Sequence, residues 1–321
     1  MRALHCVGWS LVLSGASGAC SDSVSTVLAA QPTGLHASVA AHVSANAQSW
    51  VDLRRTLHRQ PEVSGNEVRT AELVAARLRS LGLTVQTGIG GHGVVGVLTG
   101  SRPGPLVAYR ADMDAMPSTA VDPVEFASTV PGVRHICGHD MHVTVAIGLA
   151  SALASVKADL AGSVMFIFQP AEERATGARA MLNDGLFANQ RPAAVFGVHT
   201  APVTVGRLSS KAGQMMFANQ VAPGVTNDPA LYARSVAHLT AVMGPTAFAE
   251  LSAPPQGFSE DFGAFQALLP GVFFFLGAGS AAMPHSPGFV IDEAAIAVGV
   301  RAMAAVVVGA LSEPGAAGHV R

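Results

Sequence analysis

The segment from His135 to His142 carries residue types that bind metal ions. Its sequence, His-Ile-Cys-Gly-His-Asp-Met-His, stands just before an apolar stretch. Cys137 and His139 are two residues apart, so in an extended backbone their side chains point the same way, as two ligands of one ion must. Thiolate and imidazole are good ligands for zinc and related ions, and Gly138 allows a tight turn between them. The alternative is a buried cysteine beside surface histidines at the start of a helix.

Two adjacent acids follow a hydrophobic strand in the segment Phe168-Gln-Pro-Ala-Glu-Glu173. Enzymes with an α/β fold place their sites at the carboxyl ends of strands. One of two neighbouring carboxylates can bind an ion while the other takes a proton from a bound water. Taken alone, Glu172 and Glu173 can equally be two solvated acids near the positive end of a helix dipole.

His199 and His285 also follow apolar strands. His199 ends the run Phe196-Gly-Val-His, and His285 stands in the loop Met283-Pro-His-Ser-Pro after a Phe-rich strand. A lone histidine is more often structural than a ligand. Four separate elements that each end in ligand-type residues make coincidence a poor explanation, so the sequence predicts one shared metal centre.

Two further acidic segments support this centre without defining a role. Tyr109-Arg-Ala-Asp-Met-Asp indicates a strand that ends in two acids, of which Asp112 is placed to orient a ligand histidine from behind. The segment from Gly257 onwards puts Glu260 and Asp261 at a helix N-terminus. Helix capping and a role in the site remain equally open for these two acids.

The elements that must position these residues follow from the apolar pattern. Strands that are apolar throughout alternate with helices, which predicts an α/β fold around a largely parallel or mixed sheet. A capping box at Ser64 and Glu67 indicates that one helix begins at Ser64. We expect helices at 49–60, 64–81, 143–156, 177–184, 229–242, 259–269 and 292–311, and strands at 83–87, 94–98, 106–109, 164–168, 194–198 and 272–276.

The composition of the chain is that of a globular protein with a sizeable core. Half of its 321 residues are hydrophobic and 12% are charged, which excludes a disordered chain. The 19 basic and 21 acidic residues nearly balance, and no basic stripe is present. We therefore expect no nucleic-acid partner.

Residues 1–30 have the layout of a secretory signal peptide, with a short apolar run from Cys6 to Leu13 followed by small residues. That run is too short for a stable membrane span. We expect export to the periplasm or the medium, and lipid attachment at Cys20 is a weaker alternative. Cys137 is then the one cysteine of the mature body, where it can form no internal disulfide.

Together these segments resemble the metal-dependent amidohydrolase and carboxypeptidase family of hippurate hydrolases, N-acyl-amino-acid amidohydrolases and indole-acetyl-amino-acid hydrolases. The order and flanking patterns match over 51–217 and 226–311. The resemblance implies a zinc-exopeptidase-like catalytic domain at residues 45–315, a single three-layer α/β sandwich around a mixed, mostly parallel sheet. The matching segments are Leu57-His-Arg-Gln-Pro-Glu-Val-Ser, Arg110-Ala-Asp-Met-Asp-Ala-Met-Pro, Cys137-Gly-His-Asp-Met-His, Gln169-Pro-Ala-Glu-Glu, Gly197-Val-His, Ser259-Glu-Asp-Phe and His285-Ser-Pro.

The resemblance also implies a site for one or two divalent ions, manganese or zinc. The matched ligand positions are Cys137, His139, Glu173, His199 and His285. Glu172 matches the general base. The implied reaction is hydrolysis of the amide bond of an N-acyl amino acid or small peptide. The metal polarises the carbonyl and supplies hydroxide, and the base passes the water proton to the leaving amine.

One departure from the family concerns its second domain, an insert that serves as a lid and forms the dimer. Here only a short segment separates Phe217 from Thr226, so we expect the lid to be missing near 217–226 and no lid-mediated dimer. In the family the insert supplies a histidine that stabilises the oxyanion, and losing such a donor can cost on the order of a hundredfold in rate.

Three hypotheses remain after these observations. The first is an active, exported aminoacylase or carboxypeptidase-like enzyme with an open site. The second is a relative that binds metal and ligand but is catalytically impaired without the lid. The third is a cysteine hydrolase that uses Cys137 as nucleophile, although a histidine two residues away suits chelation better than proton relay.

Overall fold

The computed structural model describes residues 34–202, 208–210, 213–214, 224–250 and 260–313. The predicted leader at residues 1–30 lies outside this part of the chain, so its identity stays a prediction. The described residues belong to one compact unit.

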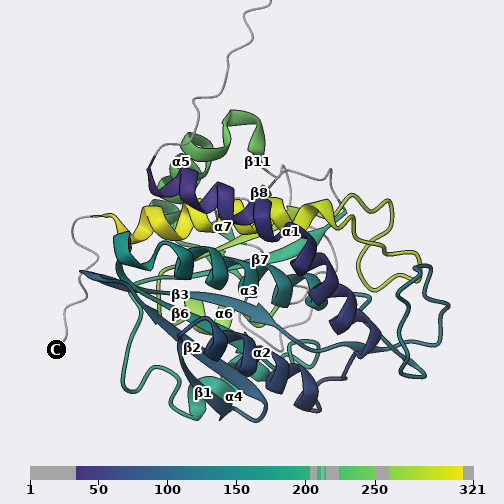
Figure 1. Ribbon diagram of the computed structural model, residues 1–321. Helices are drawn as coiled ribbons and strands as arrows, with labels where there is room; N and C mark the ends of the chain where they lie inside the picture. Colours follow the sequence, from purple (N-terminus) through teal and green to yellow (C-terminus); the bar gives the residue numbers. More distant parts are fainter. Residues whose placement is uncertain (1–33, 203–207, 211–212, 215–223, 251–259, 314–321) are drawn as a thin grey trace, which may run out of the picture. The chain divides into compact units, whose positions relative to one another are not determined.

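A mixed eight-stranded sheet runs through this unit in the order β1-β2-β6-β3-β7-β12-β8-β11 (Figure 1). Its middle strands β6, β3, β7 and β12 are parallel to one another, whereas the β1–β2, β2–β6 and β12–β8 pairs are antiparallel. The strands are β1 (Thr84–Ile89), β2 (Gly93–Thr99), β3 (Arg102–Asp112), β6 (Ala161–Gln169), β7 (Val195–Ala201), β8 (Leu208–Ser210), β11 (Phe248–Glu250) and β12 (Gly271–Gly277).

Helices cover both faces of the sheet. The larger group of helices packs on one face, and α4 (Gly177–Asn183) and α6 (Gly263–Gln266) pack on the other. This arrangement confirms the predicted α/β fold around a mixed, mostly parallel sheet. The larger group comprises α1 (Leu35–Arg59), α2 (Val68–Ser80), α3 (His139–Ser155), α5 (Pro229–Met243) and α7 (Ala294–Leu311).

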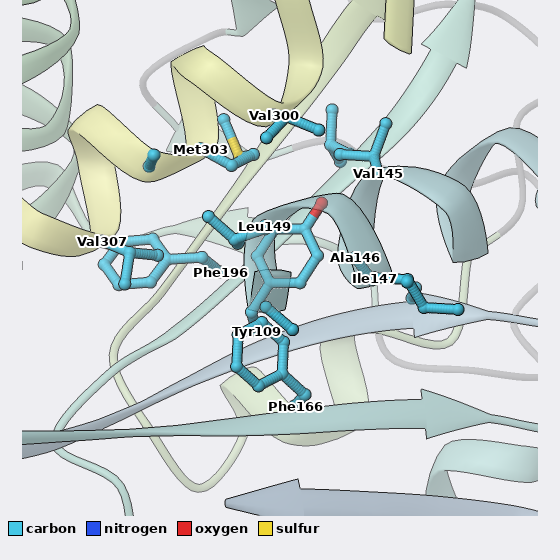
Figure 2. Packing of buried hydrophobic residues seen from close by; sticks show 14 of the residues in the cluster. Tyr109, Val145, Ala146, Ile147, Leu149, Phe166, Phe196, Val300, Met303 and Val307 are labelled. Atoms are coloured by element: carbon cyan, nitrogen blue, oxygen red, sulfur yellow. The ribbon is translucent and has the colours of Figure 1, made fainter. Parts of the chain in front are cut away.

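The continuous apolar runs of the central strands are explained by burial on both faces. In β12, Phe274 packs into the larger cluster with α3 and α7, while Phe273 and Phe275 pack into the smaller cluster on the opposite face. Figure 2 shows the larger cluster, where Tyr109 and Phe196 of the strands meet α3 and α7. The helices and strands are thereby held at fixed positions around the carboxyl ends of the strands.

Among the described helices, α7 is the one with the length and apolar composition of a membrane span. Most of that helix is buried within the unit. Packing in the core therefore accounts for its hydropathy.

The capping-box prediction at Ser64 is wrong. Helix α2 begins at Val68, and the Ser64 hydroxyl donates instead to Asp114 Oδ2 at 2.6 Å. The Glu67 carboxylate accepts from the backbone N–H groups of Gly65 and Ala171, each at 2.8 Å. Both side chains therefore connect the turn before α2 to distant loops, which local sequence does not reveal.

Two other helices differ in length from their predictions. Helix α1 begins at Leu35, well before the expected residue 49, and α6 is a single turn from Gly263 to Gln266. The expected start of that helix at 259 lies outside the described residues.

Two short antiparallel pairs complete the unit. Strand β4 (Met116–Pro117) pairs with β5 (Val133–Arg134), and β9 (Gly213–Gln214) pairs with β10 (Thr226–Asn227). In the second pair Gln214 lies opposite Thr226. Residues 215–223 between them are not described, so the absence of a lid domain near 217–226 stays a prediction.

Candidate metal centre

The elements that carry the sequence-predicted site residues meet at one edge of the sheet. Parallel strands β3, β6 and β7 end there, and the loop after β6 carries Glu172 and Glu173. His199 lies near the carboxyl end of β7, and His285 lies in the loop between β12 and α7. The His285 N–H donates to Ile136 O at 2.8 Å, which holds that loop against the segment before α3.

Cys137, His139 and His199 form the first group of potential ligands, which we call the inner triad. Their ligand atoms lie within 4.8 Å of one another, and all three residues are buried. The Cys137 Sγ is 3.2 Å from His199 Nε2. His199 Nδ1 donates to Thr200 O at 2.7 Å, so Nε2 is the nitrogen left to face the sulfur.

Cys137, Glu173 and His285 form the second group, the outer triad, which also fits within 4.8 Å. His285 Nε2 is 3.1 Å from Cys137 Sγ and 3.4 Å from Glu173 Oε1. This group is more open than the first, because the His285 side chain is 48% exposed. The two triads share one sulfur atom, as expected of two neighbouring cation sites bridged by a thiolate.

The backbone conformation between Cys137 and His139 differs from the prediction. Gly138 between them has a φ of 96°, in the left-handed region, and His139 is the first residue of α3. The backbone is therefore turned here and not extended. A Cβ at Gly138 would lie 2.5 Å from Thr200 Oγ1, so both the conformation and the close packing require glycine.

Unpartnered polar atoms indicate that a divalent ion fits these residues. His139 Nε2 and Glu173 Oε1 are buried and have no hydrogen-bond partner, and they lie 3.8 Å apart. A buried polar atom without a partner costs about 1–3 kcal/mol, which ligation of a cation would offset. Thiolate, imidazole and carboxylate together suit zinc and related ions but do not distinguish zinc from manganese.

Glu172 lies beside both triads. Its Oε2 is 3.8 Å from His139 Nε2, and the side chain is buried. Burial, together with the nearby charge of Glu260, raises the pKa of Glu172 well above its ordinary value. A carboxylate with a raised pKa is suited to take up and release a proton near neutral pH.

A buried arginine that the sequence reasoning did not single out lies behind these acids. Arg110 Nη1 is 2.6 Å from Asp112 Oδ2, and Nη2 is 2.9 Å from Glu260 Oε1 and 3.1 Å from Asp261 Oδ1. Its Nε donates to Gln169 Oε1 at 2.8 Å. The one available signal was its position two residues before Asp112, on the same face of a strand that ends at the site.

Neither Glu260 nor Asp261 caps α6, the helix that follows them, and both acids instead bond near the site. Glu260 Oε1 accepts from Phe262 N at 2.9 Å, a local bond, and Asp261 Oδ2 accepts from Ala178 N in the first turn of α4 at 3.0 Å. Burial raises the pKa of Glu260 to about 8 and that of Asp261 to about 6. Glu260 and Asp261 also lie within 4.8 Å of Glu172.

The two acids at the end of β3 have different partners. Asp112 Oδ1 is 2.6 Å from His142 Nδ1 but 3.8 Å from His139 Nε2, so it orients His142 and not a predicted ligand. Asp114 Oδ1 is 3.3 Å from His139 Nδ1. Asp114 also accepts from the N–H groups of Glu172 and Glu173 at 3.1 and 3.0 Å, so it positions the loop that carries both glutamates.

Backbone strain is concentrated at this centre. Among the described residues, the non-glycine positions with positive φ are Ala171 (51°), Ala175 (52°) and His285 (67°). The first two flank the Glu172–Glu173 loop, and the third is itself a predicted ligand. Such conformations cost about 1–3 kcal/mol each and persist where surrounding contacts enforce them, often at functional sites.

Comparisons with known proteins place relatives of this chain in one family of hydrolases. A hydrolase of Synechocystis sp. is 48% identical over 153 residues, which cover 47% of this chain and 38% of the relative. The N-acetylcysteine deacetylase of Bacillus subtilis is 39% identical over 173 residues, 52% of this chain and 44% of the relative. The chain thus spans about two fifths of the length of these relatives.

A solved structure gives the same result. The YXEP protein of Bacillus subtilis, described as a dinuclear metal-binding peptidase from family M20, superposes with a TM-score of 0.76 at 25% identity, over 84% of this chain and 99% of that one. The model of peptidase family M20/M25/M40 matches residues 108–308, which is more than half of the chain and includes all of the predicted ligands. The protein therefore belongs to peptidase family M20/M25/M40.

Proposed function

We propose that the protein hydrolyses the amide bond of N-acyl amino acids or small peptides, with divalent ions at the two triads and Glu172 as general base. The observation that carries the proposal is the pair of triads that share Cys137 Sγ beside a buried carboxylate with a raised pKa. The names of the relatives agree with it, since one is a deacetylase of an N-acyl amino acid and another a peptidase.

The reaction assigns a distinct task to each part of the site. When bound, the ions would polarise the substrate carbonyl and lower the pKa of a water molecule. Glu172 takes the proton of the attacking water and delivers it to the nitrogen of the leaving amine. Asp114 holds the backbone of Glu172 and Glu173, so that the base and its neighbouring ligand keep a fixed relative position.

The test compares the metal-loaded protein with its Glu172→Gln variant on a panel of N-acyl amino acids and dipeptides. Removing the base should lower kcat by about 10²–10⁴-fold, and because glutamine keeps the size of the side chain, metal content measured by elemental analysis is compared between the two forms. A chelator should abolish activity, and zinc or manganese should restore it. The proposal would be contradicted if the wild-type protein cleaved none of these compounds, or if it cleaved them at the same rate as the variant.

The second candidate function is a metal- and ligand-binding relative that is catalytically impaired. It is favoured by the short segment, residues 215–225, that joins β9 to β10 where the family is expected to carry a lid. Stoichiometric metal in purified protein without turnover of any amide in the panel would select this function over the first.

Export and assembly are also parts of the proposal. The leader at residues 1–30 predicts a mature N-terminus beyond it, which mass spectrometry of periplasmic or medium fractions would reveal. We propose that the lid-mediated dimer does not form, and light scattering of the mature protein would test this.

A further inference from the structure

The ring of His142 has hydrogen-bond partners on both nitrogens. Nδ1 is 2.6 Å from Asp112 Oδ1, and Nε2 accepts from Thr200 N at 2.9 Å. A backbone N–H can only donate, so Nε2 must be the acceptor and the proton must reside on Nδ1. Asp112 is in turn held by Arg110 Nη1 at 2.6 Å. The ring is therefore fixed in one neutral tautomer.

This hydrogen bonding excludes His142 as a ligand in this arrangement. Asp112, His139 and His142 lie close enough together to hold an ion. Neither nitrogen of His142 has a lone pair left for one, however, because Nδ1 carries the proton and Nε2 accepts from Thr200. His142 must serve the site in another way.

Thr200 connects His142 to two members of the inner triad. Its Oγ1 donates to Cys137 O at 3.1 Å, and its own carbonyl accepts from His199 Nδ1 at 2.7 Å. The first bond fixes the loop that presents the Cys137 sulfur, and the second fixes the rotation of the His199 ring. All of these groups are buried, so water does not compete for the bonds.

We propose that His142 is a positioning residue for the inner triad, acting through Thr200 on Cys137 and His199. The inference rests on the proposed function, because it concerns an ion held by that triad. Residues that orient metal ligands from behind typically contribute 10–100-fold to metal affinity. His142 acts on two ligands at once through a single neighbour.

The test titrates cobalt(II) into the metal-free full-length protein and follows thiolate-to-cobalt charge-transfer absorption and the number of bound ions. His142→Asn retains a donor for Asp112 but has no group that reaches Thr200. We expect it to bind one of the two ions about 10–100-fold more weakly, with reduced charge-transfer absorption. His142→Gln can place its carbonyl oxygen near the former Nε2 and should recover most of the wild-type affinity.

Two more variants separate positioning from general loss of stability. Thr200→Val keeps the shape of the side chain but removes the bond to Cys137 O, and should weaken the same ion. Ser151→Ala removes the 2.9 Å contact between α3 and His42, further along the helix that carries His142, and should leave the titration unchanged.

The outcomes distinguish this inference from the proposed function. If wild-type protein binds cobalt without thiolate absorption, the metal centre of the proposed function is itself wrong. If wild type shows the expected absorption but folded His142→Asn titrates identically, only the positioning role is overturned. Should His142→Asn fail to fold, an unaltered titration of Thr200→Val overturns the route from His142 through the Thr200 hydroxyl to Cys137.

Discussion

Arg110 Nη1 lies 2.6 Å from Asp112 Oδ2, and neither side chain is exposed to solvent. The same guanidinium also contacts Glu260 and Asp261. Three acids therefore depend on one buried cation at the back of the metal centre. Removing one partner of a buried ion pair leaves uncompensated charge, which is strongly destabilising.

We expect Arg110→Met to lower the free energy of unfolding by about 3–5 kcal/mol, measured by urea denaturation. Arg110→Lys should recover little of this, because an ammonium group lacks the planar fork that reaches several carboxylates. The control is Arg69→Met, which removes an ion pair to Glu62 from a 53% exposed side chain and should cost about 1 kcal/mol or less. Equal losses for both substitutions would contradict the argument.

The hydroxyl of Tyr109 is buried in the larger hydrophobic cluster and has no hydrogen-bond partner. Figure 2 shows the ring among aliphatic side chains of α3 and α7, near Leu149. An unsatisfied buried hydroxyl costs about 1–3 kcal/mol. Tyr109→Phe should therefore raise the free energy of unfolding by about 1 kcal/mol or more. The matched control Phe166→Leu in the same cluster should lower it, and a destabilised Tyr109→Phe would show that the hydroxyl does have a partner.

The architecture was predictable because its signals are local. Continuous apolar runs mark strands such as β6 and β12, which are buried on both faces. The ligand-type residues at their ends were recognisable for the same reason, since parallel strands must end at a common edge. Within the Cys137–His139 segment the predicted extended backbone was wrong, because a helix N-terminus brings His139 beside Cys137 as effectively as an extended segment would.

The remaining features depend on contacts between distant residues. Ser64 and Glu67 match a capping box locally, but Asp114 and the loop before Glu172 offer them partners that the pattern cannot show. Arg110 is paired with Glu260 and Asp261, which lie about 150 residues away in the sequence. His142 belongs to the recognised motif, yet its proposed positioning role depends on Thr200, which lies in strand β7 and not in helix α3.

His58 links the pH of the solution to stability. Its Nδ1 is 2.8 Å from Asp140 Oδ2, and its Nε2 is 3.0 Å from Asp122 Oδ2. Burial lowers its pKa, but the charge of Asp140 and the hydrogen bonds to both acids outweigh burial and raise the pKa to about 8. The folded state thus holds the proton more tightly than the unfolded state does, where the pKa is about 6.5.

The stabilisation from His58 should be fully present below pH 6.5 and decline as pH rises through about 8. The loss of stabilisation across this range should be about 2 kcal/mol, measured as the decrease in the free energy of unfolding from pH 6 to pH 9. His58→Gln should flatten this part of the profile. A free energy of unfolding that rises with pH over this range in the wild-type protein would contradict the prediction.

Ala175 follows the Glu172–Glu173 loop with a φ of 52°, a conformation that costs a residue with a Cβ about 1–2 kcal/mol. Ala175→Gly should relieve this strain and stabilise the protein by up to about 1 kcal/mol after the entropy of glycine in the unfolded chain is offset. Ala180→Gly, within helix α4, should instead destabilise by about 1 kcal/mol. Thermal unfolding of the two variants should therefore shift in opposite directions, and shifts in the same direction would exclude strain at Ala175.

The two triads should lose their ions at different rates. The inner triad is buried, whereas the outer one depends on His285, whose side chain is 48% exposed. A chelator should therefore remove one ion quickly and the other slowly, as followed by elemental analysis of the protein over time. His285→Ala should abolish the fast phase and retain one slowly released ion, while His199→Ala should abolish the slow phase. Because Cys137 belongs to both triads, Cys137→Ser should weaken both ions, and loss of a single ion in that variant would contradict a shared thiolate.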